Sequence, residues 1–423
     1  MENDLSFLST ANRPDILAEH IMRISAAIQK EFVFFGVQSI LCTGAASRGE
    51  LSVVQSGGCF IPYGDYDLYV CCTTPPPPRL VDNLCRNLNK ELFGGTDPSR
   101  GPLVDINIFT LKNAPEYNCD ISTYDRLNTY KVLYGADVYA DCTLDISDVP
   151  AASFLRVLLN RFSHLTVSFS TEFCTREPNR FEQVDIDKNI IKTWAEIGAA
   201  CSWLAGCYSP WIGRREISAI VAGAQKLGIR LTDSQKERIA GSLDKKIRPA
   251  SEGPAYDDWK SERVAAGTLA LRVVERMVEL TGVSGKSSTG QDVADTVYRC
   301  VPQRYFSQYI WFEIDKRIGN RHIPEQLLTA LSVCANLYER YRFFRKNPGL
   351  IPLFGDFCSP IFLFYYLTIR LFYGSREGKT CVLEDSAKQF LFKKTSSKTA
   401  PKSWEDVRTY AKSLWDGYAG RTW

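Results

Sequence analysis

The segment from Ser39 to Val70 constrains this chain more than any other. An apolar run at residues 40–42 ends close to Gly44 and predicts a strand. Small residues continue to Gly49 and predict a tight turn that leads into a helix. A strand, a glycine-rich turn and a helix together aim backbone N–H groups at one point, an arrangement that suits a phosphate group.

Two carboxylates follow this turn. Asp65 and Asp67 stand at positions i and i+2 of a run that predicts a second strand. Side chains alternate across a strand, so both carboxylates are expected on one face, with Tyr66 and Leu68 on the other. Adjacent carboxylates repel unless a cation neutralises them, and hard oxygen ligands suit Mg²⁺ or Mn²⁺.

A third carboxylate lies on a further strand-like run at residues 103–109, where Asp105 and Asn107 share the polar face. If this strand lies beside the one with Asp65 and Asp67, Asp105 completes a triad that can hold two metal ions. One ion would orient a triphosphate, and the other would lower the pKa of an attacking hydroxyl.

These features resemble the active site of the DNA polymerase β-like nucleotidyltransferase superfamily, over about residues 38–215. The resemblance implies transfer of a nucleoside monophosphate from an NTP to an acceptor hydroxyl, phosphate or amine. The superfamily usually has Gly-Ser at the turn, whereas this chain has Gly44-Ala45. Ser47 or backbone amides are therefore expected to contact the triphosphate. The long interval between Gly44 and Asp65 predicts an inserted hairpin around residues 57–58.

An Asp-x-Asp pair has little value alone. Asp185 and Asp187 form the same pattern, and we interpret them as an exposed helix start. Asp65 and Asp67 by themselves would fit a solvated strand end. The glycine turn upstream and Asp105 downstream, in this order, favour the nucleotidyltransferase interpretation.

The resemblance also implies a lysine from a second domain. Lys188 and Lys192 share one face of a helix expected at 188–205, and Lys192 is the candidate for triphosphate contact; the alternative is a solvated lysine beside Trp194. Tyr208 could stack on the nucleotide base or simply pack between helices. The predicted catalytic and metal-binding residues are Asp65, Asp67 and Asp105, and the predicted nucleotide-binding residues are Gly44, Ala45, Ser47, Arg48, Gly49, Lys192 and Tyr208.

The order of elements predicts an α+β protein, with a small mixed β-sheet core followed by an all-α C-terminal region. At 423 residues the chain has room for two or three domains. We expect a catalytic domain at 1–150, a helical domain that completes the nucleotide cleft at 151–282, and a helical region of unknown role at 283–423, with a linker at 283–291. Further helices are expected at 14–32, 79–93, 154–162, 214–227, 233–247, 257–280, 303–318, 324–345 and 360–373.

Charge and cysteine usage limit the partners. The chain has 51 basic and 48 acidic residues, a net charge of +3, so nucleic acid is not expected as a tight partner. The three histidines are scattered and no Cys-x-x-Cys occurs among 14 cysteines, so no zinc site is predicted. The polar N-terminus does not resemble a signal peptide, which predicts reduced thiols and a cytoplasmic location.

The most apolar run, at residues 361–373, includes Arg370. It is too short to span a bilayer, for which about 20 residues are needed. We interpret it as a buried helix in preference to a helix lying on a membrane surface.

The sequence thus predicts a metal-dependent nucleotidyltransferase that uses an NTP and two Mg²⁺ or Mn²⁺ ions. Its acceptor, a small molecule, a glycan precursor or a protein, is not predicted, because function depends on the surroundings of a site and not on the fold. Two alternatives stay open. One is a polymerising or cyclising enzyme, such as an RNA-tailing enzyme or an oligonucleotide-signal synthase. The other is an inactive nucleotide-binding protein, for which Ala45 is the only indication.

Overall fold

A four-stranded mixed sheet organises the first third of the chain. The computed structural model describes residues 5–9, 11–56, 59–94, 103–110, 120–249, 254–280, 290–299, 325–346, 360–376, 381–382 and 403–419. The strand order is β5-β4-β1-β6, with β1 antiparallel to β4 and β6, and β4 parallel to β5. The predicted α+β class is confirmed. The strands are β1 (Val37–Thr43), β4 (Tyr66–Cys72), β5 (Val104–Phe109) and β6 (Lys131–Gly135), of which β6 was not expected as a strand.

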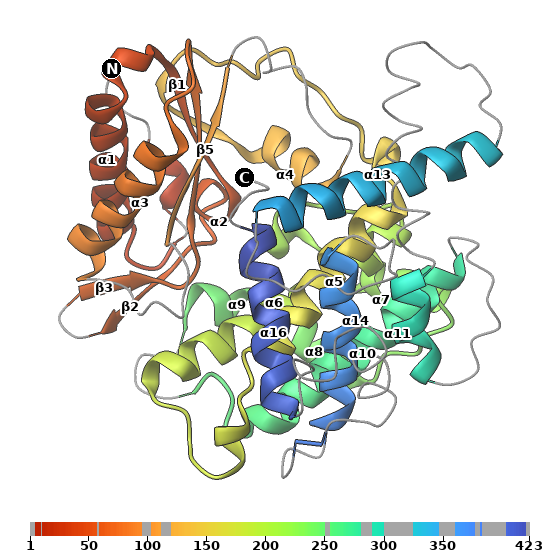
Figure 1. Cartoon of the computed structure of the whole chain (residues 1–423). Coiled ribbons are helices and arrows are strands. Elements are labelled where there is room, and N and C mark those ends of the chain that lie inside the picture. Colours follow the sequence, from red (N-terminus) through yellow and green to blue (C-terminus); the bar gives the residue numbers. More distant parts are fainter. Residues whose placement is uncertain are drawn as a thin grey trace.

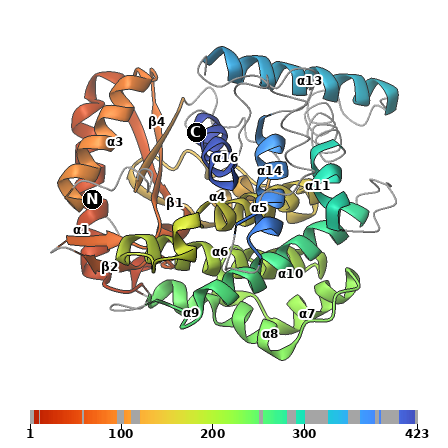
Figure 2. The same cartoon turned by 60° about the horizontal axis from the view of Figure 1, so that its bottom comes forward.

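Helices α1 (Pro14–Glu31) and α3 (Pro78–Phe93) cover one face of this sheet. In Figures 1 and 2 both lie on the outer side of the strands, opposite the helical remainder of the chain. The apolar side chains of both helices pack in one cluster with the alternate residues Leu68 and Val70 of β4. Because alternate residues point to opposite faces, Asp67 and Tyr69 lie on the other side of the sheet.

Three short elements complete the N-terminal part. The single-turn helix α2 (Gly44–Ser47) follows β1, and α4 (Ile121–Thr129) precedes β6. Strands β2 (Val53–Ser56) and β3 (Cys59–Pro62) pair antiparallel and confirm the inserted hairpin, whose turn at 57–58 lies outside the described residues.

The described residues after Pro150 are mainly helical, and these helices share one large apolar cluster. Within α14, every side chain from Ile361 to Phe372 is buried, so the interpretation as a buried helix is confirmed. No helix in the described ranges is long and apolar enough to cross a membrane. The helices are α5 (Ala151–Val167), α6 (Arg180–Leu204), α7 (Ile217–Lys226), α8 (Asp233–Ala240), α9 (Ser242–Ile247), α10 (Trp259–Leu280), α11 (Gly290–Arg299), α13 (Glu325–Lys346), α14 (Pro360–Gly374) and α16 (Trp404–Ala419).

Two sequence interpretations were wrong. Asp187 does not lie at an exposed helix start, because α6 begins at Arg180 and the Asp187 side chain is buried. It accepts hydrogen bonds from the Ala255 backbone N–H and the Gln183 side chain, both at 2.7 Å. The helix expected at 233–247 is two helices, α8 and α9, with Gly241 between them.

Several predictions stay untested. The helix at 303–318 and nearly all of the linker at 283–291 lie outside the described residues, and α11 begins within the last part of that linker. The division of the chain at residues 150 and 282 also stays a prediction. The two apolar clusters separate near residue 150, except that the buried Val54, Tyr63 and Ile121 and the partly buried Tyr124, Leu144 and Ile146 pack with the helical cluster.

Glu50 joins the sheet to the helical part. Its carboxylate lies 2.9 Å from Arg48 Nε and 3.5 Å from Lys246 Nζ, and it accepts a 2.7 Å hydrogen bond from the Ile212 backbone N–H. The Ser52 hydroxyl donates to the Lys246 carbonyl at 2.6 Å. Burial alone would raise the pKa of Glu50, but Lys246 and Arg48 outweigh it and lower that pKa. The carboxylate is therefore charged and central to this junction.

Replacing Glu50 by glutamine should destabilise the fold strongly, because the buried Lys246 and the largely buried Arg48 lose their common partner. Breaking a buried pair from one side costs about 3–5 kcal/mol. Glu91→Gln is the matched control, since Glu91 pairs with Arg23 at the surface with 61% of its side chain exposed, and exposed pairs are worth about 1 kcal/mol or less. Urea unfolding followed by fluorescence measures both. Equal midpoints for the two variants would contradict the assigned role of Glu50.

Candidate active site

The parallel pairing of β4 and β5 brings the three predicted carboxylates together. Asp67 and Asp105 are direct partners in the register of the two strands, and Asp65 stands two residues before Asp67. The Asn107 amide donates to Asp105 Oδ2 at 3.3 Å and holds that carboxylate. All lie on the sheet face that α1 and α3 leave open.

The three carboxylates change one another's pKa values. Burial, together with Asp65 and Asp105, raises the pKa of Asp67 to about 8. Burial also raises the pKa of Asp105. The hydrogen bond from Asn107 lowers this pKa, and the charge of Asp65 raises it further. At neutral pH the cluster therefore keeps a proton on Asp67 unless a cation neutralises it.

The donor chemistry of this cluster fits a divalent cation. Carboxylate oxygens are the hard ligands that Mg²⁺ and Mn²⁺ prefer, and a cation would remove the repulsion that raises the pKa of Asp67. Asp65, Asp67 and Asp105 are the residues that would hold it. Among the described side chains, however, no three histidine, cysteine, aspartate or glutamate residues form a ready-made ligand set.

The turn after β1 lies against this cluster. Gly44 has a φ of +66°, and a Cβ placed there would lie 2.1 Å from Asp67 Oδ2. Glycine is required at this position both for the backbone conformation and for the close approach of Asp67. Ala45 packs partly buried against the core of the sheet.

The Ser47 hydroxyl is engaged within the turn, and its predicted contact with a triphosphate stays a prediction. Its hydroxyl donates to the Gly44 carbonyl at 3.0 Å, and only 2% of the residue is exposed. Gly49, with a φ of +68°, closes the turn through its N–H to the Ala46 carbonyl. The backbone N–H groups at the start of α2 are therefore the better candidates for contact with a phosphate.

Arg48 and Tyr208 belong to the junction with the helical part. Arg48 pairs with Glu50, and the Tyr208 hydroxyl donates to Asp125 Oδ1 at 2.7 Å. The Tyr208 ring meets Phe154 edge-on at 5.2 Å between centroids, which agrees with the packing alternative. Sequence reasoning missed Asp125, whose pKa burial raises to about 6 against the opposing effects of Arg48 and Tyr208.

Cations from two helices face Asp65. Lys192 Nζ on α6 lies 3.6 Å from Asp65 Oδ1, so the structure brings this predicted lysine to the carboxylates. Partial desolvation opposes the charged form of Asp65, but Lys192, Lys188 and Arg161 outweigh it and lower its pKa. Lys188 and Arg161 were not among the predicted site residues, although the i, i+4 spacing of the lysines pointed to a shared face.

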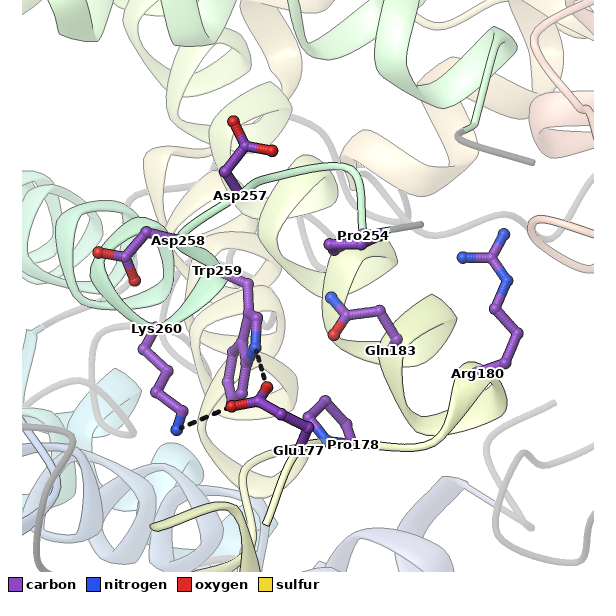
Figure 3. A pocket seen from close by; sticks show the side chains of 9 residues that line it. All are labelled: Glu177, Pro178, Arg180, Gln183, Pro254, Asp257, Asp258, Trp259 and Lys260. Atoms are coloured by element: carbon purple, nitrogen blue, oxygen red, sulfur yellow. Dashed lines mark hydrogen bonds and ion pairs between the residues drawn. The ribbon is translucent and has the colours of Figure 1, made fainter. Parts of the chain in front are cut away.

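A separate cavity of about 460 Å³ lies where α6 and α10 begin (Figure 3). Glu177, which lines it, lies 3.8 Å from Lys260 and accepts a 3.5 Å hydrogen bond from the Trp259 indole. Arg180, also in its wall, is twelve positions before Lys192 on α6, about 18 Å along a helix axis. We therefore do not place the carboxylate chemistry in this cavity.

Replacing Gly44 by alanine should destabilise the fold more than the same change at Gly228. The two residues have φ values of +66° and +67°, so both variants carry the same backbone strain. At Gly228 a Cβ meets nothing within 4 Å, whereas at Gly44 it overlaps Asp67. Overpacking of this kind costs about 1–3 kcal/mol. Thermal melting of both variants measures the difference, and equal losses would show that Asp67 does not contact the turn.

Asp67→Asn should change how stability depends on pH in the presence of a chelator. The pKa of Asp67 is raised to about 8 in the folded state. The stabilisation that comes from its bound proton is therefore fully present below the pKa of Asp67 in the unfolded chain, and it is lost as pH rises through 8. The melting temperature of the variant relative to wild type should therefore rise between about pH 4 and pH 8, then level off. Asp82→Asn, at an exposed position on α3, is the control. A flat difference for Asp67→Asn would contradict the shifted pKa.

Comparisons with known proteins give little support beyond this geometry. No protein-family model matches the chain, and no curated protein matches it. Among solved structures it is similar to the crystal structure of spectinomycin adenyltransferase AAD(9) from Enterococcus faecialis with ATP and spectinomycin. The identity is 14%, the match covers 62% of this chain and 98% of that one, and the TM-score is 0.36. A TM-score this low carries no argument about function, so the interpretation of the site depends on its own residues.

Proposed function

We propose that this chain is a metal-dependent nucleotidyltransferase, which moves a nucleoside monophosphate from an NTP to a small-molecule, glycan-precursor or protein acceptor. One observation carries the proposal. Asp67 and Asp105 are partners on parallel strands. Asp67 lies against the Gly44 turn, and Lys192 lies 3.6 Å from Asp65. Three carboxylates, a glycine turn beside them and a nearby lysine are parts that fit phosphoryl transfer, which depends on positioning and on neutralising charge.

The triphosphate would bind between the turn and the helical part. Lys192, Lys188 and Arg161 supply positive charge at this side of Asp65. Burial lowers the pKa of Lys192, and the charge of Asp65 acts in the opposite direction. A polyanion bound here would therefore favour the charged form of Lys192. Backbone N–H groups of α2 would contribute further donors.

Asp105 is the proposed base for the acceptor. Its pKa is raised by burial, which brings a carboxylate closer to the pH at which a general base works best. The acceptor proton passes to Asp105 as the acceptor atom bonds to the α-phosphorus and pyrophosphate leaves. Two divalent ions, when bound, would neutralise the carboxylates and polarise the reacting oxygens. The proposed ions are Mg²⁺ or Mn²⁺, and the proposed location is the cytoplasm.

The direct test is pyrophosphate release from each labelled NTP, with Mg²⁺ or Mn²⁺ and a metabolite extract as the source of acceptor. We expect turnover in the wild type and a loss of about a hundredfold or more in Asp65→Asn/Asp67→Asn, the scale on which a lost electrostatic contact affects catalysis. Asp82→Asn is the control for a lost carboxylate.

The products separate the proposal from its alternatives. A metabolite whose mass increases by one nucleoside monophosphate supports it. Oligonucleotide ladders or cyclic products would indicate a polymerising or cyclising enzyme. Binding of NTP without turnover, or undiminished turnover in the double variant, would overturn the proposal.

A further inference from the structure

We propose that Arg126, held against the rings of Tyr69 and Tyr139, binds an anionic group of the acceptor, a phosphate or a carboxylate. The inference rests on the proposed function, because it names one side of that site as the place of the acceptor. Arg126 is not among the site residues predicted from the sequence. Arg126 lies on α4, its guanidinium contacts Tyr69 of the sheet, and it has no acidic partner among the described residues.

Asp65, Asp67 and Tyr69 form a row of side chains on one face, and Arg126 lies over the Tyr69 end of this row. On β4, Tyr69 follows Asp67 by two residues and therefore shares its face, about 7 Å farther along the strand. Tyr69 is paired with Asn107 of β5, just as Asp67 is paired with Asp105. The guanidinium carbon of Arg126 lies 4.4 Å from the centre of the Tyr69 ring.

Aromatic rings hold this guanidinium in place. Its carbon is 5.8 Å from the centre of the Tyr139 ring, and Tyr139 stacks on Phe109 at 5.6 Å with an interplanar angle of 6°. Tyr130 meets Tyr139 edge-on at 5.6 Å. The rings of Tyr69 and Tyr139 restrict the rotamers of Arg126, so less conformational freedom would be lost on binding a ligand.

The charge of Arg126 has no acidic partner in the described part of the chain. Its Nη2 donates to the Thr123 hydroxyl at 3.3 Å, and its buried Nε has no hydrogen-bond partner. Other arginines around the site do pair with acids: Arg48 with Glu50, Arg156 with Asp120 and Arg161 with Glu196. Cation–π contact orients a guanidinium but does not neutralise it, and an anion with two oxygens would match its fork of donors.

The position of Arg126 favours the acceptor over the triphosphate. Asp65, Asp67 and Tyr69 follow one another along the chain, with Lys192 at the Asp65 end and Arg126 at the Tyr69 end. In phosphoryl transfer the attacking and leaving oxygens lie roughly in line, on opposite sides of the phosphorus. If Lys192 binds the leaving pyrophosphate, a cation at the other end of the row is placed to bind the incoming molecule.

The test uses the full chain and phenyl phosphate as the probe, with binding measured by calorimetry. Arg126→Gln should weaken phenyl phosphate binding at least about tenfold, the loss expected for one charge-assisted hydrogen bond. Arg126→Lys keeps the charge and should retain part of the affinity. Arg214→Gln is the matched control, because Arg214 stacks on Trp211 at 4.3 Å from the ring centre and is exposed. It should change the affinity less than about twofold. Binding of ATP with Mg²⁺ should be unchanged in Arg126→Gln, and thermal melting checks that each variant is folded.

Three outcomes would overturn the inference. They are absence of phenyl phosphate binding by the wild type, equal affinity in Arg126→Gln, and a parallel loss of ATP binding in that variant, which would assign Arg126 to the triphosphate. Pyrophosphate release from NTP is measured on the same samples, so a failure of the proposed function is seen separately. If phenyl phosphate binds through Arg126 but no NTP turns over, the assignment to an acceptor is overturned.

Discussion

The parallel register between β4 and β5 is the constraint on which the rest of the site depends. Tyr66 and Leu68 face the core beneath α1 and α3, and so does Ile106 of β5. A slip of one residue would bury Asp67 or Asp105 in that core, because side chains alternate with a period of two. Hydrophobic burial on one face therefore fixes the carboxylates on the other, and the site needs no separate device to align them.

Carboxylates of the sheet part pair with lysines of the helical part at two places. The sheet presents Asp65 to Lys192 of α6. Next to the turn it also presents Glu50 to Lys246 of α9. Each contact places a charge of one part against the opposite charge of the other, so neither surface would be electrostatically satisfied alone. The approach of the helical part is thus specified by a few ion pairs in addition to apolar packing.

Local patterns predicted the elements that carry the carboxylates. Alternation gave the strands around Asp67 and Asp105, and the superfamily resemblance indicated Lys192 as the candidate lysine. Features that depend on distant partners could not be predicted. The buried Asp187 carboxylate accepts a hydrogen bond from the backbone N–H of Ala255, 68 residues later. Tyr208 is held by Asp125, 83 residues earlier, and no periodicity in the sequence indicates that pair.

The closeness of Gly44 to Asp67 also has a consequence for how such a chain can diverge. The space at position 44 is closed by the Asp67 carboxylate, so a larger residue becomes acceptable there only after that side chain has shortened or moved. Substitutions at the two positions are therefore ordered in evolutionary time. A descendant that still has glycine at 44 can have kept the aspartate, whereas one with a bulky residue at 44 has already lost its geometry. The residue at position 44 therefore indicates whether the geometry of Asp67 can have been kept.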